Sequence, residues 1–388
     1  MHDVVCVIDP RFSGGTAAAL AEDMRAFLGA GLSVGLVEVF SAYLSGGRRR
    51  SKVISDMLID PRIEVIDTSG GTPLRARAVF LHHPMTFFFG ARPEVRIDAE
   101  KCFVVAHHLP FRGDGSLQYD PVATTLRIKR MTGAWPEWLP VSGVCRSQLR
   151  SFAPCIRLAE HDWPNVFDPS EWKADRTVFS EPKLVIGRHG RPDPLKWPDT
   201  AAQISASLPS LGDTEIRVMG CPRETFREMG VCMSDWHILE FDERPVPDFL
   251  AELDVFVYHF HSTLSESFGR TVAEAMLAGA VCVLDPRLAP TFGKNNAIYC
   301  RPEETKSAIE ALRGNPEKAR AMARRASAMI AERHATDTVA ARLERLLAAG
   351  RKRSAEPERA VSPMVAARKV VGMIRRGEYF PRSGPTRN

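Results

Sequence analysis

The sequence predicts an α/β protein with two parallel-sheet domains. Apolar runs typical of buried strands alternate with segments of helical spacing, and this alternation occurs in two series along the 388 residues. Between the two series, residues 161–178 are rich in proline and aspartate and have no periodicity, which indicates a linker. The chain is long enough for two domains of ordinary size.

The first domain is expected over residues 1–160. A strand begins almost at the first residue, a loop containing Gly14 and Gly15 follows it, and a helix is predicted over 16–30. A Gly-Gly pair alone is also what an ordinary tight turn contains. The strands predicted for this domain cover residues 3–8, 32–39, 63–66, 78–82, 102–106 and 139–144.

The second domain is expected over residues 179–350. It repeats the alternation and closes with two helices over 303–349 that are rich in alanine, arginine and glutamate. Its predicted strands lie near residues 183–187, 214–219, 236–240, 254–258 and 280–284.

Composition is that of a soluble globular protein, with 44% hydrophobic and 26% charged residues. No basic leader precedes the first strand, and no apolar run approaches the roughly 20 residues of a spanning helix. The eight cysteines are scattered without a Cys-x-x-Cys pair, which favours free thiols in a reducing compartment. We therefore expect a cytoplasmic protein.

Positive charge gathers in residues 351–388, which hold ten Lys or Arg and three Glu. This tail carries +7, against +5 for the whole chain. Apolar residues at helical spacing over 364–376 predict a helix that crosses back onto the first domain. The alternative is peripheral contact with the anionic inner face of a membrane. Nucleic acid is not expected as a partner, because the tail has few interleaved aromatic residues.

Two glutamates stand eight positions apart in the segment 265–279, which reads Ser-Glu-Ser-Phe-Gly-Arg-Thr-Val-Ala-Glu-Ala-Met-Leu-Ala-Gly. Gly269 precedes a segment with the spacing of a buried helix face. Free N–H groups and the helix dipole favour an anion at such a helix start. Glu266 lies in the loop before the helix, and Glu274 lies about two turns into it. Buried strands flank the segment, as at a ligand site of an open parallel sheet.

Cations occur after the first predicted strand of the second domain. The run 183–188 ends in Gly187 and Arg188, Lys196 follows, and Arg191 lies between them. Cationic groups stabilise a diphosphate leaving group, because its negative charge grows as the bond to it breaks. An ordinary basic surface loop would have the same composition.

The segment 265–279 resembles the Glu-x7-Glu signature of retaining glycosyltransferases with the GT-B fold, in particular family 4. The spacing of the carboxylates, the Phe-Gly pair and the Glu-Ala-Met continuation agree, whereas Ser267 stands where many members have glycine. The resemblance implies two Rossmann-like domains facing a cleft, with a nucleotide-sugar donor held mainly by the second domain.

The resemblance also implies roles for the matched residues. Glu266 would contact the donor sugar, Glu274 the nucleotide ribose, and Arg188 and Lys196 the donor phosphates. The other positions implied for donor binding are Gly14, Gly15, Phe268, Gly269, Arg270 and Thr271.

Histidine pairs follow two strands of the first domain. Family members often have a histidine near the donor sugar, and His108 fits that place better by strand register than His107. The pair His82 and His83 follows its own strand in the same way. Metal binding is an alternative for these pairs, but no carboxylate or cysteine lies nearby at ligand spacing.

Together these features predict a metal-independent retaining transfer of a sugar from a nucleotide-diphosphate sugar to a glycan, lipid-linked glycan or polysaccharide. Cationic side chains and helix amides would serve the phosphates, so we expect no cofactor. One alternative is a non-catalytic sugar- or nucleotide-binding protein with this fold. Another is a different GT-B enzyme, such as a nucleotide-sugar epimerase or a phosphorylase. The pattern leaves the base, sugar, acceptor and oligomeric state open.

Overall fold

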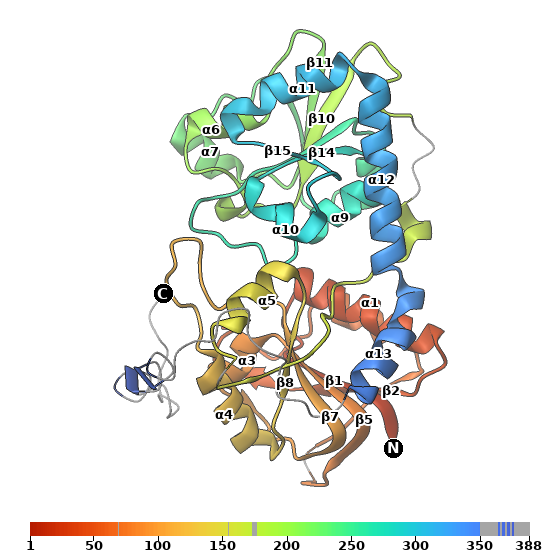
Figure 1. Ribbon diagram of the computed structural model, residues 1–388, viewed down its shortest axis with the longest axis vertical. Helices are drawn as coiled ribbons and strands as arrows, with labels where there is room; N and C mark the ends of the chain where they lie inside the picture. Colours follow the sequence, from red (N-terminus) through yellow and green to blue (C-terminus); the bar gives the residue numbers. More distant parts are fainter. Residues whose placement is uncertain are drawn as a thin grey trace. The chain divides into compact units, whose positions relative to one another are not determined.

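The computed structural model describes residues 1–68, 70–153, 155–172 and 177–349. It also describes six residues beyond these ranges, at positions 364, 367, 368, 371, 372 and 375. These residues form two compact units (Figure 1). The first unit contains Met1–Phe111, Gly115–Val166 and the described residues from Thr336 on. The second contains Arg112–Asp114 and Phe167–Ala335.

A seven-stranded sheet forms the centre of the first unit, in the order β4-β2-β1-β5-β7-β8-β9. All neighbouring strands pair in parallel. Every residue from Val4 to Ile8 of the central strand is fully buried, because helices cover both faces of such a sheet. The strands are β1 (His2–Ile8), β2 (Val34–Glu38), β4 (Ile63–Val65), β5 (Leu74–His82), β7 (Ile97–Ala106), β8 (Glu137–Pro140) and β9 (Arg157–Leu158).

Helices connect these strands, and β3 (Phe40–Ser41) and β6 (Ala91–Arg92) form a separate antiparallel pair. Helix starts follow local capping rules: the side chains of Asp120 and Ser142 accept backbone N–H groups at the starts of α4 and α5. The helices of this unit are α1 (Gly15–Gly29), α2 (Lys52–Met57), α3 (Pro84–Phe88), α4 (Pro121–Thr132), α5 (Gly143–Arg150), the 3₁₀ turn η5 (Thr336–Thr338) and α13 (Val339–Ala348).

A six-stranded parallel sheet forms the centre of the second unit, in the order β12-β11-β10-β13-β14-β15. The order reverses at β10, so later strands lie on its two sides. Ligands bind open α/β sheets at such a switch point, beyond the carboxyl ends of the strands. The strands are β10 (Leu184–His189), β11 (Thr214–Met219), β12 (Trp236–Leu239), β13 (Val255–Tyr258), β14 (Val281–Leu284) and β15 (Ile298–Tyr299).

Helices surround this second sheet, and short 3₁₀ turns occur in several of its loops. The α-helices are α6 (Ala201–Ser207), α7 (Arg223–Met229), α8 (Val246–Leu250), α9 (Arg270–Leu277), α10 (Ala289–Phe292), α11 (Thr305–Arg313) and α12 (Pro316–His334). The 3₁₀ turns are η1 (Pro169–Trp172), η2 (Pro194–Lys196), η3 (Pro286–Leu288) and η4 (Pro302–Glu304).

The predicted α/β architecture with two parallel sheets is confirmed, with local corrections. The strand expected over 139–144 covers Glu137–Pro140 instead, because Ser142 already caps α5. Strands β5 and β7 begin earlier than predicted, since their first residues alternate between more and less exposed positions and do not form apolar runs. The short strands β3, β6, β9 and β15 have no apolar run that a sequence pattern could detect.

The end of the chain differs from the expected division. Residues up to 350 were assigned to the second domain, but α13 packs against α1 in the first unit (Figure 1). The helix expected over 364–376 lies mostly outside the described residues. No helix in the described ranges combines the length and apolar character needed to cross a membrane.

Candidate active site

Polar side chains gather at the switch point of the second sheet. Arg188 and His189 end β10, and Tyr258 ends the neighbouring strand β13. The loop after β13 leads to Glu266 and then to α9. Elements distant in sequence therefore bring the residues of the predicted donor site to one edge of this sheet.

Lys196 and Glu266 form the first contact of this site. The Lys196 Nζ lies 2.6 Å from Glu266 Oε2, and the Tyr258 hydroxyl donates to the same oxygen at 2.8 Å. Burial alone lowers the pKa of Lys196, but the Glu266 charge and the Tyr258 hydroxyl raise it above its usual value. Lys196 is thus kept as a cation beside a carboxylate, with Tyr258 as a neutral donor.

Arg188 is buried behind this contact rather than displayed on the surface. Its guanidinium donates to the carbonyl oxygens of His259 at 3.1 Å and Lys196 at 2.5 Å, and its Cζ lies 3.8 Å from the centre of the Trp197 ring. Burial lowers the pKa of Arg188 to about 10, so it remains charged at neutral pH. Arg188 fixes the backbone that carries Lys196.

Glu274 forms a second cluster on α9. Its Oε1 lies 2.9 Å from Arg270 Nε, and its Oε2 lies 3.2 Å from His189 Nε2. His189 is 4% exposed, and within the described part of the chain its Nδ1 has no hydrogen-bond partner. A buried carboxylate in this position can accept hydrogen bonds from the hydroxyl groups of a ligand, such as those of the ribose in a nucleotide.

The start of α9 depends on Gly269, which is the N-cap residue with φ of 86°. A Cβ on Gly269 would come within 3.3 Å of the Phe292 ring. Beside it, the buried Phe268 packs against Phe292 and His334 and anchors the loop. Thr271 Oγ1 is buried at the first turn, and no described residue forms a hydrogen bond with it. This helix start presents N–H groups and the positive end of its dipole.

The remaining predicted residues lie in the first unit. Gly14 is the N-cap residue of α1, and Gly15 is exposed as the first residue of that helix. His108 Nε2 lies 2.8 Å from Gln118 Oε1 at the end of β7.

His82, His83 and His107 are buried and form a cluster with the partly buried His108. His82 Nδ1 lies 3.0 Å from His107 Nε2, and burial lowers the pKa of His107 to about 3. Among the described residues, no group of three or more His, Cys, Asp or Glu is arranged to hold a metal ion.

His83 is a candidate that sequence reasoning did not select. It has a left-handed backbone with φ of 71° and is 5% exposed, and its Nδ1 has no hydrogen-bond partner among the described residues. Such strain in a residue other than glycine occurs often at functional sites. Tyr258 and His189 were also missed, although each ends a strand at the carboxyl edge, which is the signal that could have found them.

Comparisons with known proteins identify a matching family model and similar folds. Residues 217–348 match the family model described as glycosyl transferase-like, and this segment includes Glu266 and Glu274. The solved structure of Anabaena HepE in complex with UDP and glucose has a TM-score of 0.63 and 13% identity, covering 90% of this chain and 100% of that one. The fold is GT-B.

Two further solved structures share this fold. WaaG, a glycosyltransferase involved in lipopolysaccharide biosynthesis, has a TM-score of 0.58 and 12% identity, covering 89% of this chain and 100% of that one. A glycosyltransferase from Rickettsia africae has a TM-score of 0.59 and 10% identity, covering 89% of this chain and 97% of that one. No curated protein matches the chain in sequence.

Proposed function

We propose that the protein is a retaining glycosyltransferase of the Glu-x7-Glu type, family 4, which transfers a sugar from a nucleotide-diphosphate sugar to an acceptor hydroxyl. The observation that carries this proposal is the gathering of Lys196, Glu266, Glu274 and the start of α9 at the switch point of the second sheet. The glycosyl transferase-like match over 217–348 supports the same conclusion.

The proposed roles follow from charge and position. Lys196 and the amides at the start of α9 stabilise the departing diphosphate, whose charge grows in the transition state. Glu266 orients the donor sugar and holds Lys196 in its charged form. Glu274 accepts hydrogen bonds from the ribose hydroxyl groups, and His108 and His83 are the histidines of the first unit to test for a role in sugar binding.

Retention is assigned to attack on the same face of the sugar. The acceptor oxygen bonds to the anomeric carbon as the bond to the diphosphate oxygen breaks, and the acceptor proton passes to the departing phosphate. Cations and helix amides already serve the phosphates, so no metal enters this scheme. We place the reaction in the cytoplasm, with peripheral membrane contact as an addition to be tested.

Nucleotide binding and release test the proposal. UDP-glucose is the first donor to examine, because structures of the similar protein HepE hold UDP or UDP-glucose. One of UDP, GDP and ADP should raise the melting temperature by mass action. The protein should then release that nucleotide from its sugar donor and leave an α-linked product. A purely binding protein would be stabilised without releasing nucleotide.

A Glu274→Gln variant connects this result to the site. A charge-assisted hydrogen bond contributes about 1.5–3 kcal/mol, so the nucleotide dissociation constant should rise about tenfold or more. Calorimetry measures this constant. The control is Glu310→Gln, a change of the same kind on the exposed side of α11. Equal dissociation constants in the two variants would remove Glu274 from the ribose role.

A further inference from the structure

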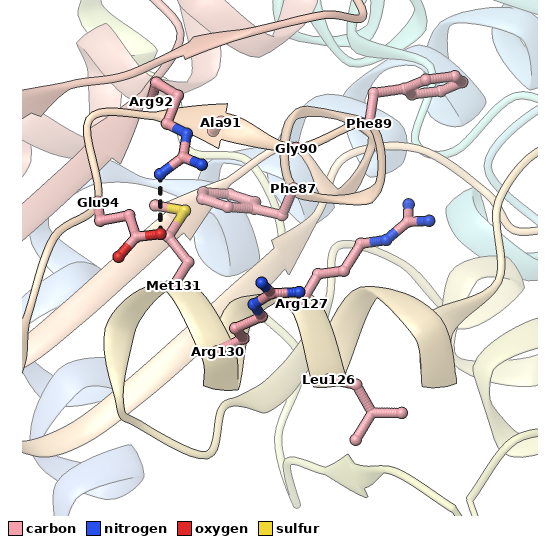
Figure 2. A pocket seen from close by; sticks show the side chains of 10 residues that line it. All are labelled: Phe87, Phe89, Gly90, Ala91, Arg92, Glu94, Leu126, Arg127, Arg130 and Met131. Carbon is pink, nitrogen blue, oxygen red and sulfur yellow. Dashed lines mark hydrogen bonds and ion pairs between the residues drawn. The ribbon is translucent and has the colours of Figure 1, made fainter. Parts of the chain in front are cut away.

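A cavity of about 390 Å³ in the first unit lies among α3, β6 and α4, outside the residues discussed above. Its wall is apolar where Phe87 and Met131 meet, and these side chains are 1% and 8% exposed. Figure 2 shows the Met131 sulfur directed towards the Phe87 ring, with Phe89 further along the same wall.

The rim of this cavity is cationic. Arg92, Arg127 and Arg130 line it, and Glu94 is the one carboxylate among its lining residues. Arg92 is paired with Glu94 at 2.8 Å. Arg127 and Arg130 are three positions apart on α4 and extend from the same side of it, whereas Leu126 points the other way (Figure 2).

These arginines differ in how they are held. The Arg127 Cζ lies 4.8 Å from the centre of the Phe88 ring, which fixes the guanidinium over an aromatic face. Arg130 is exposed and forms no ion pair with a carboxylate in the described part of the chain. Planar guanidinium groups bind the oxygens of a phosphate in pairs, so the rim fits a phosphate better than a neutral group.

Ring contacts join this cavity to the histidine cluster. The Phe89 ring lies 5.5 Å from Tyr43, and Tyr43 stacks on His83 at 5.7 Å. Helix α3 itself begins directly after His83. A molecule seated in the cavity would therefore extend along this wall towards the carboxyl edge of the first sheet.

We propose that this cavity binds the acceptor, and that the acceptor is an anionic amphiphile: a phosphate ester attached to an apolar chain. The phosphate would contact Arg127 and Arg130, and the chain would lie against Phe89 and the exposed part of Met131. This inference rests on the proposed function, because it assigns the second substrate of the same transfer reaction.

Direct binding tests the proposal without requiring catalysis. Hexyl phosphate, inorganic phosphate and hexanol are titrated into the full-length protein by calorimetry. Hexyl phosphate should bind at least about tenfold more tightly than either fragment, since only it offers both the charge and the apolar chain. Arg130→Glu should weaken hexyl phosphate about tenfold or more. The matched control is Arg49→Glu, at an exposed position of the same unit outside this lining.

Three results would overturn the proposal. Equal binding of hexyl phosphate and hexanol would show an apolar site only, and equal affinity in the Arg130 and Arg49 variants would show no role for the rim. Binding of phosphatidylglycerol vesicles that depends on Arg130, without hexyl phosphate binding, would assign the surface to a membrane instead. Thermal shift with UDP, GDP and ADP is measured in parallel. If none of these nucleotides binds, the proposed function is wrong, whereas the result for hexyl phosphate binding is unaffected.

Discussion

Lys196 shows how a cation is prepared for phosphate chemistry at the scale of one residue. Burial disfavours its charged form, whereas the neighbouring Glu266 carboxylate and Tyr258 hydroxyl restore it. Arg188 acts one layer deeper, where it binds two backbone carbonyls and stacks on Trp197. The sequence predicted both cations at the phosphates; we propose Lys196 for that contact, with Arg188 supporting the backbone that carries it.

Lys196→Met should lower kcat about 10²–10³-fold, because a preorganised charge at a developing anion contributes that much to the rate. The donor KM should change less, since the phosphate charge is greater in the transition state than in the bound donor. Steady-state kinetics with the nucleotide sugar identified by thermal shift provide the measurement.

Lys183→Met is the control for that variant, because Lys183 is exposed in the same unit and its Nζ pairs with Glu215 Oε2 at 2.9 Å. A rise in KM with kcat unchanged in Lys196→Met would show that Lys196 binds the donor equally in both states. The catalytic assignment would then be wrong.

The buried His107 makes the stability of the first unit depend on pH. Its pKa is about 3 in the folded protein against about 6.5 when unfolded. Because the folded value is the lower one, its contribution to stability is complete above about pH 6.5 and is lost as the pH falls towards 3. Each unit by which the pH falls in this window lowers the free energy of unfolding by about 1.4 kcal/mol for one such group.

His107→Gln should therefore flatten the fall of unfolding free energy between about pH 6 and 4, by up to about 1.4 kcal/mol per pH unit. Urea unfolding at several pH values measures this slope. Exposed His161→Gln should leave it as in the unaltered protein. If both variants have the original slope, the buried imidazole of His107 does not control the acid sensitivity.

At the scale of elements, two strand-to-helix junctions hold residues of the proposed site. The αL residue Gly269 turns the chain from the loop of Glu266 into α9, and His83 does the same between β5 and α3. One junction uses the residue that tolerates this backbone, whereas the other places a histidine there at a cost in strain. Both junctions lie at the carboxyl ends of parallel strands, where an α/β sheet can present side chains to a ligand.

Gly269→Ala should destabilise the second unit by about 1–2 kcal/mol, because a Cβ is disfavoured at φ of 86° and approaches Phe292 at 3.3 Å. It should also weaken nucleotide binding, since the first N–H groups of α9 would shift. Gly29→Ala is the control, because Gly29 ends a helix with open space around its Cβ position. Chemical denaturation and calorimetry should separate the two variants; identical stabilities would mean that the junction is not strained.

For the molecule as a whole, the described residues from Thr336 on return to the unit that contains β1. Helix α13 packs against α1, and Arg342 donates to the Pro164 carbonyl at 2.9 Å. Apolar spacing over 364–376 predicts a helix that crosses back onto the first domain, whereas the described helix that packs there is an earlier one, Val339–Ala348. The helix predicted over 364–376 is a different one, and its docking on the first domain stays a prediction.

Leu343→Ala should destabilise the first unit by about 2–5 kcal/mol, because Leu343 is fully buried in α13. Nucleotide affinity should remain unchanged, since the proposed donor site belongs to the second unit. Arg345→Ala on the exposed side of α13 should cost less than about 0.5 kcal/mol. Equal unfolding midpoints for the two variants would show that α13 adds nothing to the first unit.

The sequence by itself determined the two parallel sheets and the Glu266–Glu274 segment. Continuous apolar runs such as Val4–Ile8 predict buried parallel strands, and local spacing places Glu274 on a helix that begins after Gly269. These features are local, because strand burial, helix period and capping depend on residues that are close in the chain.

Only the tertiary structure decided which partners those residues meet. Lys196, which follows β10, reaches Glu266, which follows β13, because the two strands are neighbours, and His189 at the end of β10 reaches Glu274 on α9. The same holds for the burial of Arg188 and for the cavity between α3 and α4. Such contacts join residues tens of positions apart, so they depend on sheet order and packing, which local spacing does not encode.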